Sequence, residues 1–161
     1  MGSVAKIVLF LKDFVNVINE VVAKNHPVEF GDGMDWFFQQ VLYGTEICDY
    51  AVSSISNDHK VTSARIFDNL DECEQSEMAK NENDEPIFKS SVVVERLGDM
   101  TMPMEILIWF EYGHKVVEQW DGTATMKEFS YEGTRKIVCA EIDPQHKIFL
   151  DKNFLNNSYT S

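Results

Sequence analysis

Apolar and polar residues alternate along most of the segment from residue 88 to residue 151, and this is the period of half-buried β-strands. The clearest strand covers residues 102–111. In it Ile106 and Ile108 fall on one face, while Trp109 falls on the other. Similar short apolar segments recur at residues 116–120, 126–131 and 136–142, with the spacing of about 8–12 residues that is typical of sandwiches and barrels. The pattern therefore predicts an antiparallel β-sandwich.

Two further strands are predicted before this segment, at residues 47–55 and 59–66, with residues 54–58 as their connection. Within the later segment, Asp121-Gly122 is a strong short-range hairpin signal, because glycine tolerates the positive φ that tight hairpin turns require. The tetrapeptide Tyr112-Gly113-His114-Lys115 is expected to form another turn.

The N-terminal part has helical periodicity. Residues 4–23 predict one helix that is apolar around much of its circumference and that ends at Asn25-His26-Pro27, because proline disfavours the helical conformation of the preceding residue. A second helix is expected over residues 34–43, ended by Gly44. Asp32 and Asp35 lack the further ligands of a calcium loop, so helix capping by one of them is the favoured role.

These elements predict a mainly β protein preceded by two helices. Residues 1–45 form the expected helical segment, which is either the end of a larger domain or an oligomerisation element. Residues 46–161 form the expected β-sandwich domain.

The net charge of −13 argues against binding to nucleic acid or to anionic membranes, where lysine and arginine dominate. More than half of this charge lies at residues 68–86, which hold eight acidic residues and Lys80 as the one basic residue. With so few apolar residues, we expect this stretch to be a mobile insertion between strands, and an acidic clamp for a partner is the alternative. No segment has the ~18 consecutive apolar residues of a membrane span.

No motif of catalysis is recognisable. The cysteines (Cys48, Cys73 and Cys139) are widely spaced, and the histidines form none of the pairs that bind zinc on a helix. Glycine-rich phosphate loops and the serine nucleophile elbow are also missing from the sequence. The sequence thus predicts no catalytic, cofactor-binding or metal-binding residue. Asn156-Asn157-Ser158 fits the common glycosylation pattern, which alone carries little weight.

Trp109 and Trp120 are the candidate binding residues. Exposed aromatic side chains on a sandwich can form a platform for a sugar ring. Packing in the core or against another domain is the favoured role for both tryptophans.

Three groups of segments together resemble the region that follows the catalytic domain in bacterial zinc metallopeptidases of the aminopeptidase N type, the gluzincins. The first runs from Trp36-Phe37-Phe38-Gln39-Gln40 to Thr45, followed by Asp49-Tyr50-Ala51-Val52. The second comprises Val92–Gly98, Met102–Ile106 and Trp120-Asp121-Gly122. The third comprises Ile142-Asp143-Pro144, Leu150–Asn153 and Asn156-Asn157-Ser158.

The resemblance covers residues 36–158 and implies an immunoglobulin-like sandwich preceded by helices from the end of the catalytic domain. The family's zinc signature His-Glu-x-x-His and its Gly-x-Met-Glu-Asn motif have no match here, so no catalytic residue is carried over. The implied role is that of a non-catalytic accessory domain, which packs beside a catalytic domain and lines its substrate cleft.

Two other expectations accompany this hypothesis. A free-standing binding module for a glycan or a basic protein, with Trp109, Trp120 or the acidic stretch as its contact site, is the alternative function. In addition, the apolar helix over residues 4–23 is expected to pair with a second copy of the chain when its natural partner is absent.

Overall fold

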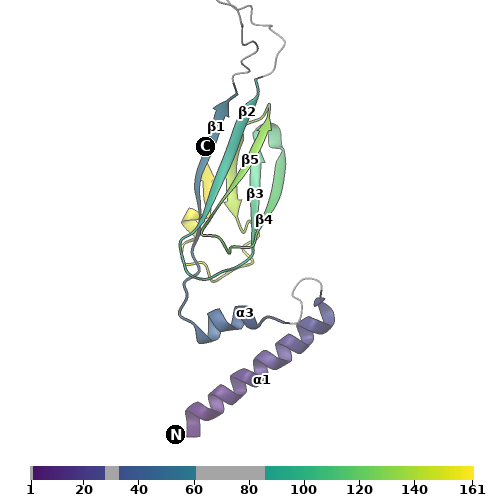
Figure 1. Cartoon of the computed structure of the whole chain (residues 1–161), viewed down its shortest axis with the longest axis vertical. Helices are drawn as coiled ribbons and strands as arrows, with labels where there is room; N and C mark the ends of the chain where they lie inside the picture. The colour runs from purple at the N-terminus through teal and green to yellow at the C-terminus, as the bar shows by residue number, and fades with distance from the viewer. Residues whose placement is uncertain (1, 28–32, 61–85) are drawn as a thin grey trace, which may run out of the picture.

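The structure is a computed structural model that describes residues 2–27, 33–60 and 86–161. The long helix α1 (Gly2–Asn25) lies at one end of the molecule, and a unit of two β-sheets forms the remainder (Figure 1). The short helix α3 (Asp35–Phe38) lies between them. The prediction of a mainly β protein that begins with a helix is therefore confirmed.

In the described part of the chain, seven antiparallel strands form two sheets. One sheet has the order β1-β2-β5 and the other the order β4-β3-β6-β7. The strands are β1 (Tyr50–His59), β2 (Phe88–Arg96), β3 (Met104–Phe110), β4 (Lys115–Trp120), β5 (Met126–Gly133), β6 (Ile137–Ile142) and β7 (Ser158–Thr160). The strands predicted from residue 102 onward match β3 to β6 closely, because each has one apolar face.

Side chains from both sheets pack into one core. Ile106 and Ile108 of β3 face Val92 and Val94 of β2, and all four have no exposed surface. Trp120, with an exposed fraction of 2%, packs edge-on against Tyr50 with ring centroids 5.4 Å apart. Burial of these apolar side chains is the main source of the stability of the two-sheet unit.

Polar side chains link the two sheets at the edges of the core. Asn57 of β1 accepts a hydrogen bond from the backbone N–H of Ile137 (2.8 Å) and donates one to its carbonyl (3.0 Å). At the opposite edge, the Tyr131 hydroxyl of β5 donates to Glu118 of β4 (2.9 Å). These bonds satisfy polar groups that pairing within each sheet leaves free.

The residues Asp121-Gly122 form a turn, but the predicted hairpin is wrong. The turn leads from β4 in one sheet to β5 in the other, so the two strands do not pair. Gly122 has φ +70°, and a β-carbon there would collide with the Tyr50 hydroxyl and the Met102 carbonyl. Glycine is therefore required by a close approach of the backbone to the core.

The predicted connection at residues 54–58 is also wrong, because β1 runs through it to His59. Apart from Ile55 these residues are polar, yet Asn57 and Asp58 pair in register with Ser90 and Lys89 of β2, and the Asn57 side chain bonds across to β6. Sheet pairing thus overrides the local turn signal. The remainder of the predicted strand at 59–66 and nearly all of the acidic stretch 68–86 lie outside the described residues.

The helical segment differs from the prediction in its second part. The first helix is confirmed, whereas residues 34–43 form only one α-helical turn, α3, followed by the π-helical segment η1 (Gln39–Tyr43). Of the two candidate caps, Asp35 forms no cap hydrogen bond, and Asp32 lies outside the described residues. Asn19 of α1 accepts the N–H of Met34 (2.8 Å) and donates to the Asp35 carboxylate (2.7 Å), so these two bonds join the start of α3 to α1.

Candidate functional site

The two candidate tryptophans lie in different environments. Trp109 is on the outer face of β3 with an exposed fraction of 38%, and the Lys115 ammonium lies 4.8 Å from its ring centroid. Trp120 is in the core, so its ring is not accessible from the surface. A binding role at the surface therefore stays a prediction for Trp109 alone.

Within the described residues, no group of three or more His, Cys, Asp and Glu side chains is arranged to hold a metal ion. Burial, together with the nearby Asp151 and Asp49 carboxylates, raises the pKa of the Cys48 thiol to about 12, so this cysteine is a core residue without thiolate character. None of the described helices is long and apolar enough to span a membrane.

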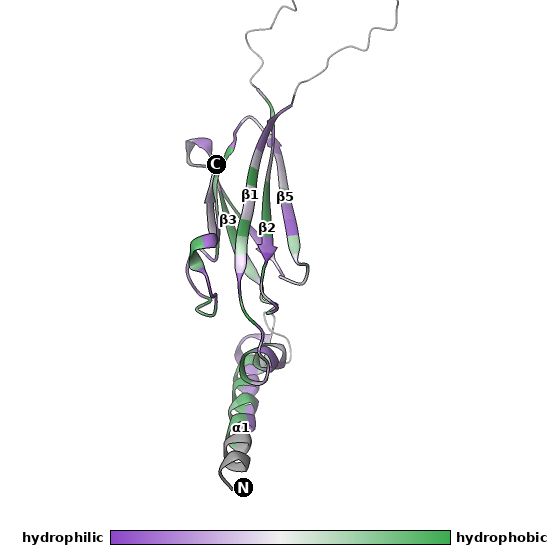
Figure 2. Cartoon of the chain, turned by 90° about the vertical axis from the view of Figure 1, so that its left-hand side faces the viewer, coloured by the Kyte–Doolittle hydropathy of each residue, from purple (hydrophilic) through white to green (hydrophobic). Residues whose placement is uncertain are grey.

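Exposed apolar side chains gather at the end of the two-sheet unit that faces the helices. They come from the loops before β1, between β2 and β3, and between β6 and β7. Figure 2 shows several of these segments in green near the lower end of the unit. The most exposed are Phe149 (83%) and Leu155 (91%). The apolar end comprises Ile47, Leu97, Phe149, Leu150, Phe154 and Leu155.

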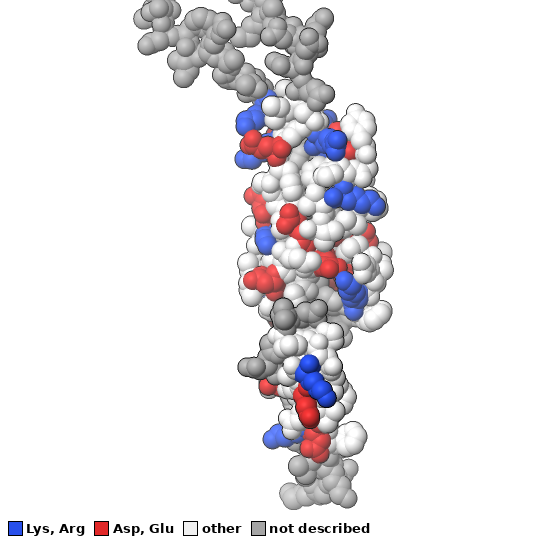
Figure 3. Space-filling view, turned by 90° about the vertical axis from the view of Figure 1, so that its right-hand side faces the viewer, with Lys and Arg blue, Asp and Glu red and all other residues white. Residues whose placement is uncertain are grey.

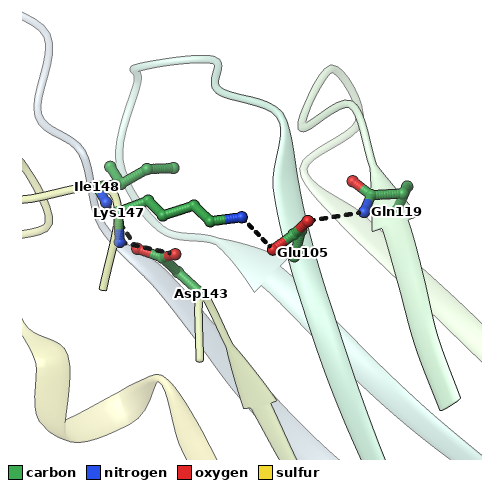
Figure 4. Close-up of polar contacts among 5 residues, drawn as sticks. All are labelled: Glu105, Gln119, Asp143, Lys147 and Ile148. Atoms are coloured by element: carbon green, nitrogen blue, oxygen red, sulfur yellow. Dashed lines mark hydrogen bonds and ion pairs between the residues drawn. The ribbon is translucent and has the colours of Figure 1, made fainter. Parts of the chain in front are cut away.

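Buried carboxylates hold the loop that carries most of the apolar end. Asp143 accepts hydrogen bonds from the backbone N–H groups of Lys147 (3.0 Å) and Ile148 (2.7 Å), as Figure 4 shows. Lys147 in turn forms an ion pair with Glu105 of β3 (2.8 Å), and this bond lowers the pKa of the Glu105 carboxyl. The exposed Phe149 therefore extends from a loop with a fixed backbone.

A second carboxylate fixes the other half of this loop. Asp151 accepts from the backbone N–H groups of Tyr50 (3.3 Å) and Asn153 (2.8 Å) and from the Asn157 side chain (3.2 Å). Next to it, the Asn156 amide donates to Asp49 (3.1 Å). This contact uses the nitrogen that a glycan would modify, so the glycosylation pattern has a structural role here. A preorganised loop loses less entropy when it binds a partner.

The helix α1 carries a second exposed apolar surface, the α1 stripe, which consists of Phe10, Phe14, Val17 and Val21. Their exposed fractions lie between 47% and 76%. Their spacing of four, three and four residues is that of the seam along which two helices pack. Beside this stripe α1 contacts α3, where Val15 is buried and the half-exposed Phe14 meets Phe38 edge-on at 6.0 Å.

A hollow of about 510 Å³ lies beside this contact, between α1 and the α3–η1 segment. It is lined by Lys12, Val15, Asn16, Asp35, Phe38, Gln39 and Tyr43. Because the α3–η1 segment is fixed to the two-sheet unit through paired hydrogen bonds between the Gln40 side chain and the Thr101 backbone (2.7 and 3.1 Å), α1 is held near the apolar end. Both apolar surfaces thus belong to the same end of the molecule.

Sequence patterns did not identify the apolar end. The apolar run Ile148-Phe149-Leu150 follows the turn at Asp143-Pro144. In the structure this run forms no strand, and it was the one sequence feature that could have indicated an exposed apolar loop. Comparison of the chain with protein-family models, with curated proteins and with solved structures finds no match. The function therefore has to be inferred from the surfaces of the molecule itself.

Proposed function

We propose that this chain is a non-catalytic accessory module of a larger metallopeptidase-like protein. It packs beside the catalytic domain through the apolar end and the α1 stripe, and contributes a wall to the substrate cleft. The observation that carries the proposal is the concentration of rigidly held, exposed apolar side chains at one end of the molecule. Patches of this kind usually belong to interfaces, because they are costly to leave in water.

The sheet topology supports an immunoglobulin-like assignment. Strands one, two and five form one sheet, and strands three, four, six and seven form the other. Constant-type immunoglobulin domains place seven strands as ABED and CFG, so this chain differs only in the sheet that its fourth strand joins. Sandwich domains with such variations are widespread as spacer and interaction modules, which is an argument from fold analogy.

The resemblance to the post-catalytic region of gluzincins supports the same role. Its third group of segments contains Asp143, Asp151 and Asn156, the residues that order the loop at the apolar end. Its first contains Gln40, which bonds the α3–η1 segment to the two-sheet unit. The resembling residues thus serve to shape one end of the molecule, as a docking module requires.

The decisive experiment extends the chain by the coding sequence that precedes it in its natural gene. We expect that sequence to encode His-Glu-x-x-His, and we expect hydroxyl-radical footprinting to show protection of Phe10, Phe149 and Leu155 in the extended protein. Trp109 and Val117 lie on the outer face of the four-stranded sheet, away from the apolar end. They serve as internal controls and should keep their labelling. An upstream sequence without the zinc signature, or unchanged labelling at the apolar end, would refute the proposal.

An activity assay tests the non-catalytic part of the proposal. The chain alone, supplied with zinc, should not hydrolyse aminoacyl substrates above the rate of the buffer. Hydrolysis that scales with protein concentration would overturn this assignment.

The alternative function is a free-standing binding module, favoured by the outer face of β3 and β4. There Trp109 adjoins Val117, which is 57% exposed, and Lys115. Titration with a glycan panel or with a basic peptide should change the fluorescence of Trp109 in this case, and Trp109→Phe should abolish the change. Absence of any change across both ligand sets would eliminate this alternative.

A further inference from the structure

A second hollow lies at the end of the two-sheet unit opposite the helices. It has a volume of about 300 Å³, which is the lower limit of typical ligand pockets. It opens between the turn that joins β3 to β4 and the turn that joins β5 to β6. Its lining consists of Phe110, His114, Tyr131, Glu132, Gly133, Thr134 and Arg135.

The walls of this hollow are aromatic. Phe110 meets Tyr131 edge-on with centroids 5.2 Å apart, and the His114 ring is tilted against Phe110 at 5.5 Å. Phe110 is buried, whereas Tyr131 is half-buried and His114 is exposed. The rings of Tyr131 and His114 can therefore contact the flat face of a ligand.

Among the described residues, two carboxylates near the hollow, Glu132 and Glu118, have partners other than Arg135. The Glu132 carboxylate forms an ion pair with Lys60 (2.8 Å) and lies opposite Lys89 in the strand register, and the Lys60 contact lowers its pKa. Glu118 accepts the hydroxyl proton of Tyr131 in a hydrogen bond. Neither of these two carboxylates forms an ion pair or a hydrogen bond with the guanidinium of Arg135.

Arg135, by contrast, has no hydrogen bond or ion pair within the part of the chain that the structure describes. It is exposed at the rim of the hollow. Lys115 and Lys136 flank the same turns, and each places its ammonium 4.8 Å from a ring centroid, on Trp109 and Phe88. Figure 3 shows basic side chains on both sides of this upper end of the unit. An unpaired guanidinium beside aromatic walls is unusual in a chain with a net charge of −13.

We propose that this hollow binds a small aromatic carboxylate. The Arg135 guanidinium binds the ligand carboxylate by donating two parallel hydrogen bonds, and the ring of the ligand lies against Tyr131 and His114. A monoanion fits better than a phosphate dianion, because Glu132 lines the same hollow and repels additional negative charge. This inference does not depend on the proposed accessory role.

Titration of the full chain with phenylacetate, followed by amide NMR, tests the proposal. We expect saturable shifts at Phe110, His114, Tyr131 and Thr134 with a millimolar dissociation constant. Arg135→Gln should weaken binding at least tenfold, because it removes a charge-assisted bidentate contact. Lys152→Gln removes an exposed cation at the opposite end and should leave the affinity unchanged. An unaltered amide spectrum of Arg135→Gln without ligand would show that the variant remains folded.

Two further probes separate this site from a general attraction of anions. Phenylacetamide has the same ring without the charge, and inorganic phosphate has the charge without the ring. Both should bind at least tenfold more weakly than phenylacetate. The proposal fails if phenylacetate gives no saturable shifts, if Arg135→Gln binds as well as the unmodified chain, or if either probe matches phenylacetate.

Discussion

The two-sheet unit and the helix α1 have similar apolar side chains but expose them very differently. Ile106 and Ile108 have no exposed surface in the core between the sheets, whereas Phe10 and Val17 of α1 are 76% and 57% exposed. The sheets bury their apolar faces against each other, so the core of this unit is complete without a partner. The helix buries one side against α3 and leaves the other open. The two-sheet unit is therefore a stable scaffold, and α1 adds an apolar surface that no described residue covers.

The largest effect is expected from a substitution in the core. Ile106→Ala removes a fully buried side chain between the sheets and should lower the free energy of unfolding by about 3–4 kcal/mol. The matched substitution Val17→Ala in α1 should change it by less than ~0.5 kcal/mol, because that side chain is mainly in water. Urea unfolding followed by circular dichroism measures both. Equal costs would contradict the distinction between the two regions.

The second effect concerns association through the α1 stripe. Because the stripe has the spacing of a helix-packing seam, the chain alone should form dimers at high concentration, and sedimentation velocity should detect them. Phe10→Glu combined with Val17→Glu places charges in the seam and should weaken association by about a hundredfold, the scale of two unpaired charges in an apolar contact.

A control variant with the same added charge separates this effect from general repulsion. Thr123→Glu combined with Ser130→Glu changes two exposed positions of the two-sheet unit and should leave the dimers intact. A chain that stays monomeric at high concentration with α1 helical would show that the stripe does not drive self-association.

Much of the two-sheet unit could be predicted from the sequence, for a physical reason. In a strand with one buried face, apolar and polar residues must alternate. The segments that form β3 to β6 can therefore be predicted without coordinates. Their assignment to two sheets was not, because Asp121-Gly122 has the local chemistry of a hairpin, whereas packing against Tyr50 directs the chain across the core. Local turn chemistry does not encode which strand comes next to which.

The apolar end was harder to predict than the fold. A sequence pattern identifies apolar residues but assumes that they are buried, and Phe149 and Leu155 are not. Polar residues caused the opposite error. The extension of β1 through Ser56 and Asn57 depends on hydrogen bonds to Ser90 and Ile137, which are distant in the sequence. Both errors arise where tertiary contacts decide the environment of a residue.

A third effect concerns alkaline pH. Burial raises the pKa of Cys48 from 9.0 and that of Tyr50 from 10.0, each to about 12. Between pH 9 and 12 the unfolded chain therefore loses these protons before the folded one, so the free energy of unfolding should fall as the pH rises, by at most about 1.4 kcal/mol per pH unit for each group. Below pH 9 both groups are protonated in both states and have no effect.

Two variants show how much each group contributes to the slope of the free energy of unfolding against pH. Cys48→Ala should remove its part from pH 9 upward, and Tyr50→Phe should remove the part that begins near pH 10. Tyr50→Phe should also cost about 2 kcal/mol at neutral pH, because the backbone N–H of Met102 loses its acceptor at 2.8 Å. Urea unfolding at a series of pH values measures both effects. A slope unchanged in both variants would mean that other groups dominate the alkaline response.

The smallest effect is expected from shortening the acidic stretch. The strands on either side of it pair up to His59 and Phe88, and the N–H of Lys60 bonds the Ile87 carbonyl at 2.8 Å, so the ladder is closed before the stretch begins. Replacing residues 68–85 by a short Gly-Ser link shortens the loop, which reduces the entropy of closing it by less than ~1 kcal/mol. It also removes eight acidic residues and one lysine, which lessens repulsion at low salt. We therefore expect the free energy of unfolding to change by no more than about 1 kcal/mol, as measured by thermal and urea unfolding.

A Gly-Ser segment of the original length, as the control, separates the effect of charge from that of length. A loss above about 2 kcal/mol in both variants would mean that side chains of this stretch pack on the two-sheet unit, and the scaffold would then not be self-sufficient.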